Sequence, residues 1–269
     1  MKGQPPLLYT VPQKRKLAWR ECGEGPALVF IHGMGGNSRN WKTQYQHFSS
    51  RFRVIGWDAP GYGGSDDWDT DQPRVKDYVE EILTLLNILG VEKAHLVGHS
   101  FGGTLMPAFK KKYPDRVESM VLAQPVIGSG LFGPIGLDQI IQGRERLLQS
   151  MGAEKFSKLH APKSVAVNAD AQTIKKAIEV TSWMRPTGYL AQWRAMAHAN
   201  IFEEIPQEPG PTTVVLGTED KTASREVVTQ ILEVISGARL AELQDVGHMI
   251  YIEHPSRFNK VLEEHFTKL

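Results

Sequence analysis

The segment from Ala94 to Gly103 constrains the fold of this chain most, because an apolar strand pattern changes there into a helical pattern through Gly-x-Ser-x-Gly. A serine at such a turn has a strained backbone and presents its hydroxyl at the end of a sheet. Gly98 and Gly102, on either side of Ser100, leave room for neighbouring backbone. The alternative is a glycine-rich turn with an inert serine. The apolar run before Ser100 and the small residues after it favour the nucleophile elbow.

The charges and the single cysteine exclude several classes of protein. The 269 residues include 31 basic and 30 acidic side chains, and neither sign forms a long block, so we expect no nucleic acid and no membrane among the partners. The only cysteine, Cys22, excludes an internal disulfide and a cysteine-based metal cluster. No segment approaches the roughly 18 apolar residues of a membrane span, and no apolar signal segment follows Lys2. We therefore predict a cytoplasmic protein.

Strand and helix patterns alternate along most of the chain. The continuously apolar run 27–31 is typical of a strand buried on both faces, as in a parallel sheet. Further strands are predicted over 15–22 as the edge of a hairpin, over 53–57, in the segment leading to Ser100, and over 117–123, 212–216 and 239–243. Helices are predicted over about 37–50, 73–90, 223–236 and 255–268, and behind Ser100.

The alternation stops between Val126 and Pro206, where only helices are predicted, over 138–151, 153–160, 170–185 and 187–199. An insertion of this length cannot lie inside a parallel sheet, so we expect it to cover one edge of the sheet as a cap. The prediction is an α/β fold with a mostly parallel central sheet flanked by helices and a helical cap inserted after the sixth strand. Residues 1–125 and 207–269 then form the core domain, and residues 126–206 form the cap.

Glycine-rich loops follow two of the predicted strands. His32 to Gly36 follows the strand 27–31, where free backbone N–H groups could build an oxyanion hole, although a plain strand-to-helix turn fits the same residues. Asp58 begins the second loop, directly before Ala59-Pro60-Gly61. A carboxylate in that position more often ties its own turn through local hydrogen bonds than acts as a catalytic acid.

Ser100, Asp220 and His248 occur in that order at the ends of predicted strands of one sheet. A serine hydroxyl is a poor nucleophile at neutral pH, so it needs a base within hydrogen-bond reach and a carboxylate that orients that base. His99 and His254 are alternatives for the base, and Glu219 is the alternative for the acid. His248 is favoured because it alone follows a strand through a loop of the right kind.

From about residue 15 to 266 the sequence resembles the α/β-hydrolase fold superfamily. The matching motifs, in family order, are His32-Gly33-Met34-Gly35, Asp58-x-Pro-Gly-x-Gly-x-Ser65, Gly98-His99-Ser100-Phe101-Gly102-Gly103, Gly217-x-x-Asp220, and Gly247-His248 followed by Glu253-x-Pro255.

The resemblance implies a catalytic triad of Ser100, Asp220 and His248, with an oxyanion hole made by the backbone N–H groups of Met34 and Phe101. It implies that His32 organises its loop and is not a base. It also implies that no metal and no organic cofactor takes part, and that the partner is a small-molecule apolar ester or a related acyl compound.

The same motifs exclude some relatives. Haloalkane dehalogenases and epoxide hydrolases of this fold have an aspartate where this chain has Ser100, and Met34 interrupts the three glycines of the lipase-type loop. Carboxylesterases, enol-lactonases, C–C bond hydrolases and cofactor-free perhydrolases remain. We expect a serine hydrolase that cleaves an ester of a small to medium apolar substrate through an acyl-enzyme. The alternatives are a C–C bond (meta-cleavage product) hydrolase or an enol-lactonase and, from another class, a ligand receptor that retains the triad.

The cap is rich in large apolar side chains, most of which we expect to pack the cap onto the core while the others line an apolar pocket. They are Leu131, Phe132, Met151, Phe156, Trp183, Met184, Trp193, Met196 and Phe202. The cap also contains Arg144, Arg146, Arg185 and Arg194. A cap arginine facing Ser100 would favour the C–C bond hydrolase or enol-lactonase.

Overall fold

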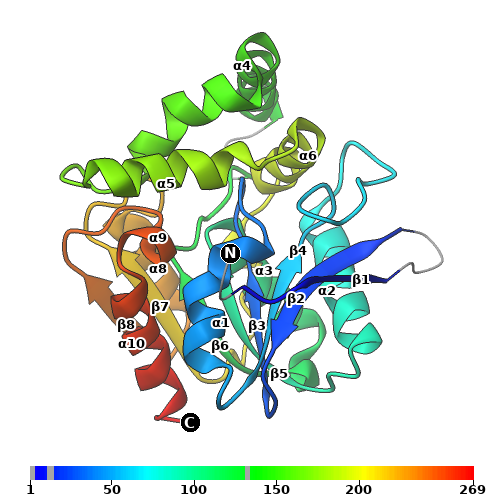
Figure 1. Ribbon diagram of the computed structural model, residues 1–269, viewed down its shortest axis with the longest axis vertical. Helices are drawn as coiled ribbons and strands as arrows, with labels where there is room; N and C mark the ends of the chain where they lie inside the picture. Colours follow the sequence, from blue (N-terminus) through cyan, green and yellow to red (C-terminus); the bar gives the residue numbers. More distant parts are fainter. Residues whose placement is uncertain (1–3, 11–14, 131–133) are drawn as a thin grey trace.

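The computed structural model describes residues 4–10, 15–130 and 134–269, and an eight-stranded sheet runs through their centre (Figure 1). The strands lie in the order β1-β2-β4-β3-β5-β6-β7-β8. The pairs β1–β2 and β2–β4 are antiparallel, and the other pairs are parallel. The prediction that 15–22 forms an edge strand is wrong, because the strand at these residues lies between β1 and β4, and β1 takes the edge. The strands are β1 (Leu7–Thr10), β2 (Leu17–Cys22), β3 (Ala27–Ile31), β4 (Arg53–Asp58), β5 (Ala94–His99), β6 (Val117–Ala123), β7 (Thr212–Gly217) and β8 (Arg239–Leu243).

Helices cover both faces of the sheet because alternate residues of the central strands point to opposite sides. In β3, Val29 and Ile31 pack into the apolar cluster beneath α2 (Val75–Ile88), α3 (Phe101–Lys112) and α8 (Arg225–Val234). Leu28 and Phe30 pack on the other face, against α1 (Lys42–Phe48) and α10 (Pro255–Phe266). The predicted doubly covered, mostly parallel sheet is confirmed. No described helix has the length and apolar character that crossing a membrane would require.

Short elements differ from the sequence predictions. The helix expected over 37–50 is a 3₁₀ turn η1 (Ser38–Trp41) followed by α1. The helix expected from Pro73 begins two residues later as α2, since Arg74 is its N-cap residue. The structure adds β1, α7 (Ile201–Glu204), α9 (Ile250–Glu253) and the 3₁₀ turns η2 (Pro114–Arg116) and η3 (Ala161–Ser164). Each of these covers three or four residues, which is too short for a hydrophobic period to appear in the sequence.

The cap contains α4 (Pro134–His160), η3, α5 (Ala171–Ser182), α6 (Pro186–Ala197) and α7, inserted between β6 and β7. Figure 1 shows α4, α5 and α6 together at one end of the sheet. Gly152, with φ 70°, interrupts the helical backbone of α4 at the boundary expected between the helices 138–151 and 153–160. The predicted insertion of helices after the sixth strand is therefore confirmed.

Two arginines hold the cap on loops of the core. Arg185 donates to the carbonyl of Gly61 at 3.0 Å and pairs with Asp67 at 3.1 Å. Arg194 pairs with Glu145 of α4 at 2.6 Å and with Asp71 of the core at 3.2 Å. These two side chains are therefore occupied in attaching the cap.

At the opposite end of the sheet, His265 of α10 is buried between two hydroxyl groups. Its Nδ1 lies 2.9 Å from the Thr213 hydroxyl, and its Nε2 lies 2.9 Å from the Ser119 hydroxyl. Burial first, and then the nearby charges of His95 and Arg239, lower the pKa of His265 to about 4. The folded protein therefore holds this imidazole in its neutral form.

This burial makes stability depend on pH. Because the unfolded chain takes up the His265 proton near pH 6.5 and the folded protein only near pH 4, the free energy of unfolding should fall as the pH falls between these values. His265→Gln can bond both hydroxyl groups without titrating. Its pH dependence, measured by denaturant unfolding, should be flatter by up to about 1.4 kcal/mol per pH unit. Equal slopes for the two proteins would contradict this assignment.

Candidate active site

Ser100 lies at a sharp turn between β5 and α3, with φ 56° and ψ −121°. This backbone conformation is strained for a residue with a side chain. A Cβ on Gly98 would lie 2.3 Å from the carbonyl oxygen of Gly102, and a Cβ on Gly102 would lie 2.4 Å from that of Ile31. The turn can close only with glycine at both positions, as the Gly-x-Ser-x-Gly pattern predicts.

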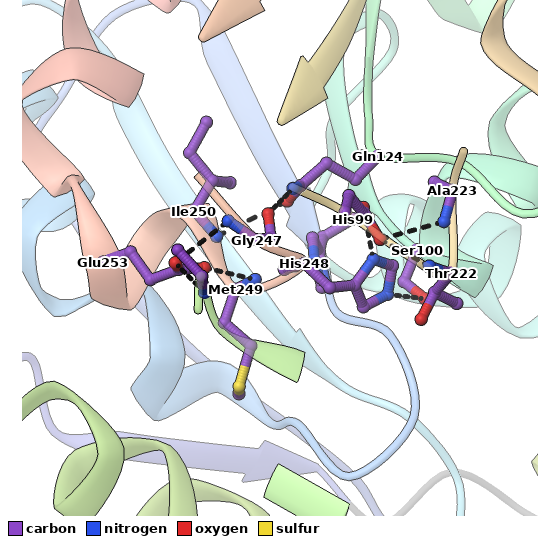
Figure 2. Close-up of polar contacts among 12 residues, drawn as sticks. His99, Ser100, Gln124, Thr222, Ala223, Gly247, His248, Met249, Ile250 and Glu253 are labelled. Carbon is purple, nitrogen blue, oxygen red and sulfur yellow. Dashed lines mark hydrogen bonds and ion pairs between the residues drawn. The ribbon is translucent and has the colours of Figure 1, made fainter. Parts of the chain in front are cut away.

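The structure brings the hydroxyl of Ser100 and the imidazole of His248 together. His248 lies in the loop between β8 and α9, and its Nε2 is 2.9 Å from Ser100 Oγ (Figure 2). Its Nδ1 lies 2.7 Å from Asp220 Oδ2. Because an ionised carboxylate only accepts hydrogen bonds, Nδ1 donates to Asp220, and Nε2 is left free to accept from the serine hydroxyl.

Asp220 follows β7 and is nearly fully buried. Its Oδ1 accepts hydrogen bonds from the backbone N–H groups of Thr222 at 2.7 Å and Ala223 at 3.0 Å. Burial by itself raises the pKa of the Asp220 carboxyl, but the charge of His248 and the hydrogen bonds from His248, Ala223 and Thr222 outweigh it and lower the pKa. Asp220 is therefore ionised and held in one orientation against the imidazole.

The rival residues have other partners. Glu219 Oε2 accepts from the backbone N–H of Val167 in the cap at 2.6 Å. His99 is buried, and its Nε2 donates to the carbonyl oxygen of His248 at 2.6 Å. Burial first, and then the charge of His248, lower the pKa of His99 to about 3, so His99 is neutral and supports the backbone of the neighbouring loop. His254 is the N-cap residue of α10.

Two further side chains hold the backbone of the His248 loop, and neither was predicted from the sequence to have this role. Glu253 accepts from the backbone N–H groups of Gly247 and Met249, both at 3.0 Å. Gln124, directly after β6, donates to the carbonyl of Gly247 and accepts from the N–H of Ile250 at 3.4 Å (Figure 2). Glu253 stood in the motif Glu253-x-Pro255, but no local pattern points to Gln124, which has φ 51° and acts across the sheet.

The loop after β3 lies against Ser100. A Cβ on Gly33 would lie 2.7 Å from the Cβ of Ser100. His32 accepts from the N–H of Ala59 at 3.0 Å through Nε2 and donates to the carbonyl of Gly33 at 2.8 Å through Nδ1. Burial lowers the pKa of His32, so its ring is neutral and fixes the loop.

The two backbone N–H groups expected to form the oxyanion hole belong to the residues that follow Gly33 and Ser100, which are in close contact. Met34 follows Gly33, and Phe101 is the first residue of α3. Within the described ranges neither backbone N–H has a backbone acceptor. Asp58 is not part of this site, because it accepts from the N–H groups of Ser38 at 2.6 Å and Gly64 at 2.9 Å, which is the turn-tying role favoured from the sequence.

A cavity of about 530 Å³ opens over Ser100 and His248. Of the apolar cap residues named from the sequence, Phe156, Trp193 and Met196 line it. Met151, Met184 and Phe202 pack in the apolar cluster of the core and do not line the cavity. Trp183 does not line it either, and its ring centroid lies 5.3 Å from the guanidinium carbon of Arg39. Leu131 and Phe132 lie outside the described residues. Over the described ranges, no group of three or more His, Cys, Asp or Glu side chains could hold a metal ion.

Comparison with known proteins gives a family match across most of the chain. A model of the family described as the alpha/beta hydrolase fold matches residues 26–255. The chain is 26% identical to the 2-hydroxy-6-oxo-6-phenylhexa-2,4-dienoate hydrolase of Comamonas testosteroni, over 90% of this chain and 88% of that protein.

Two solved structures have the same fold over almost their whole length. The enol-lactonase of Burkholderia xenovorans LB400 has a TM-score of 0.87 and 23% identity, covering 97% of this chain and 100% of that one. A thermophilic esterase of Thermogutta terrifontis, with malate bound, has a TM-score of 0.87 and 22% identity, covering 98% of both chains.

The contacts of Asp220 and Glu219 predict different effects of neutralising each carboxylate. Asp220→Asn can donate to His248 Nδ1 and so stabilise the wrong imidazole tautomer, for which a rate loss on the order of 10⁴ is known in a serine protease. Glu219→Gln touches only the cap backbone and should change kcat by less than about threefold. Steady-state rates of both variants with one activated ester measure the difference. A normal rate in Asp220→Asn together with a collapsed rate in Glu219→Gln would assign the acid to Glu219.

Proposed function

This chain belongs to the alpha/beta hydrolase fold family, and from that premise we propose that it is a serine hydrolase that cleaves a carboxylic ester through an acyl-enzyme. The observation that supports the proposal most is the hydrogen-bonded series from Ser100 through His248 to Asp220, with distances of 2.9 and 2.7 Å, at a cavity large enough for a small molecule.

In the proposed reaction, Ser100 Oγ attacks the ester carbonyl carbon while its proton moves to His248 Nε2. The charge of Asp220 stabilises the resulting imidazolium through Nδ1–H. The backbone N–H groups of Met34 and Phe101 donate to the oxyanion of the tetrahedral intermediate. His248 then protonates the leaving alkoxide, which leaves the acyl group on Ser100. A water molecule then attacks the acyl carbon while His248 Nε2 takes its proton, and the bond between the acyl carbon and Ser100 Oγ breaks as His248 returns that proton to Oγ, which releases the acid.

The pocket supports a substrate of small to medium size. Its volume of about 530 Å³ is within the usual range of small-molecule sites, and Phe156, Trp193 and Met196 form an apolar wall on the cap side. In this proposal residues 126–206 form the cap that controls substrate access and preference, while 1–125 and 207–269 form the domain that performs the reaction.

A C–C bond hydrolase or enol-lactonase is the second candidate, and the charge of the pocket favours it. Arg144, Lys163 and Lys221 line the cavity, and its described lining residues include no aspartate or glutamate. The Comamonas testosteroni relative is by its name a hydrolase of a dienoate, which is an anion. Turnover of an aryl ester, an enol-lactone and a vinylogous diketone acid, compared side by side, distinguishes the candidates. Repeated turnover of any of them excludes a receptor that only binds its ligand.

A covalent probe tests the nucleophile. A fluorophosphonate should add once to the protein, on Ser100, because only this hydroxyl has a base within hydrogen-bond distance at the pocket. Peptide mass mapping locates the adduct, and Ser100→Ala should lose both the adduct and the activity. Labelling of another residue, or full activity in Ser100→Ala, would refute the assignment.

Two tryptophans of the cap form a matched pair for testing specificity. Trp193 lines the pocket, whereas Trp183 lies beside Arg39 outside it. Trp193→Ala should change the ratio of kcat/KM between hexanoate and acetate p-nitrophenyl esters by roughly 10-fold or more, because each methylene in an apolar pocket changes transition-state binding by about 1–3 kcal/mol. Trp183→Ala should leave that ratio unchanged. A flat ratio in both variants would show that the cap wall does not set chain-length preference.

A further inference from the structure

We propose that Arg144 is the binding site for a carboxylate of the substrate, so that the preferred substrate is an ester or related acyl compound with a second, ionised carboxyl group away from the scissile bond. The proposal rests on the serine hydrolase function for the reaction, but the binding of a carboxylate at Arg144 can be measured without turnover.

Arg144 lies on α4 and is a half-buried residue that lines the same cavity as Ser100 and His248. Its guanidinium carbon is 4.6 Å from the ring centroid of Trp193 and 5.6 Å from that of Phe156. Aromatic faces attract a guanidinium and fix its plane, while its N–H edge can still bind a carboxylate through two parallel hydrogen bonds. The structure therefore holds this cation in a defined position inside the pocket.

The polar partners of Arg144 are few. One of its terminal nitrogens lies 3.4 Å from the hydroxyl of Tyr189, which is a weak hydrogen bond. No carboxylate among residues 4–10, 15–130 and 134–269 forms an ion pair with it. Its neighbour in sequence, Glu145, pairs with Arg194 at 2.6 Å. A cation removed in part from water without a counter-ion is destabilising, and a bound carboxylate would compensate for this cost.

The other cap arginines do not offer this site. Arg185 pairs with Asp67 and Arg194 with Glu145 and Asp71, and both attach the cap to its surroundings. Arg146 is exposed on α4 and does not line the cavity. Among the described cap arginines, Arg144 is therefore the one that lines the cavity without an ion pair to a carboxylate.

The surrounding charges favour an anion as well. Lys163 and Lys221 are exposed residues that line the cavity and add positive charge to it. His160 also lines it, and burial first, then the charges of Arg144 and Lys163, lower the pKa of its imidazole. Asp220 is occupied by His248 and by two backbone N–H groups, and it does not line the cavity.

A series of matched esters tests the subsite through activity. Mono-p-nitrophenyl esters of succinate, glutarate, adipate and pimelate are compared with the same compounds capped as methyl esters at the free carboxyl group. For the chain length that fits the pocket, kcat/KM should be higher for the ester with a free carboxylate than for its methyl-capped form. Arg144→Gln should lower this ratio of kcat/KM values by roughly 10- to 100-fold, the range of charge-assisted hydrogen bonds. Arg144→Lys keeps the positive charge but loses the two parallel N–H groups of the guanidinium, so it should retain part of this ratio.

Arg146→Gln, which removes an exposed arginine two residues further along the same helix, is the control and should leave the rates with both esters unchanged. A wild-type enzyme with no preference for any anionic ester would overturn the proposal. An anionic preference that survives in a folded Arg144→Gln protein, checked by thermal melting, would overturn it too.

A binding measurement separates the subsite from the reaction. Free succinate, glutarate, adipate and pimelate are titrated into the Ser100→Ala protein by calorimetry, and one of them should bind. In the double variant that also carries Arg144→Gln, the affinity for that dicarboxylate should be at least 10-fold weaker. If Ser100→Ala still hydrolyses the esters while this binding result holds, the serine mechanism fails and the subsite stands. If Ser100→Ala is inactive but Arg144→Gln changes neither binding nor preference, the subsite fails and the serine mechanism stands.

Discussion

The close packing of three backbone segments around Ser100 is the constraint on which the rest of the site depends. The end of β5, the start of α3 and the loop after β3 approach so closely that a Cβ on Gly33, Gly98 or Gly102 would lie within 2.7 Å of a neighbouring atom. This packing holds Ser100 at φ 56°, a conformation that costs of order 1–3 kcal/mol and persists only where its surroundings enforce it. The same packing sets the positions of the Met34 and Phe101 N–H groups.

The imidazole of His248 reaches Ser100 from the other half of the sheet, and its position depends on a different set of contacts. Glu253 and Gln124 bind the backbone on both sides of it, His99 donates to its carbonyl, and Asp220 fixes its ring. The cap contributes as well, because the backbone N–H of His248 donates to the carbonyl of Ser164 in η3 at 2.8 Å, and Glu253 accepts from the N–H of Ala166 at 2.8 Å. The cap therefore has two parts in the site: its segment 164–166 helps to hold the His248 loop, and residues such as Phe156 and Trp193 form the wall of the pocket.

The sequence predicted the parts of the structure that local patterns determine. The strands β2 to β8 lie within two residues of their predicted bounds, because apolar runs or alternating patterns that end in turn residues mark them in the sequence. Ser100, Asp220 and His248 could be proposed from the sequence because each follows a predicted strand. Gln124 could not be found, since it acts on residues more than 120 positions away. The sequence did not show that Trp193 lines the pocket while Trp183 does not, or which of the four cap arginines lines it. Both depend on how the cap helices are rotated against the sheet, and this rotation is determined by packing and not by the periodicity of the sequence.

We propose that Ser100, activated by His248 and oriented by this packing, forms a covalent acyl intermediate. The intact mass of the protein, measured after mixing with an activated ester and quenching in acid within milliseconds, tests it most directly. We expect a mass gain equal to one acyl group in the wild-type protein and no gain in Ser100→Ala. An ester that turns over without any acylated protein at any quench time, or an equal mass gain in Ser100→Ala, would contradict it.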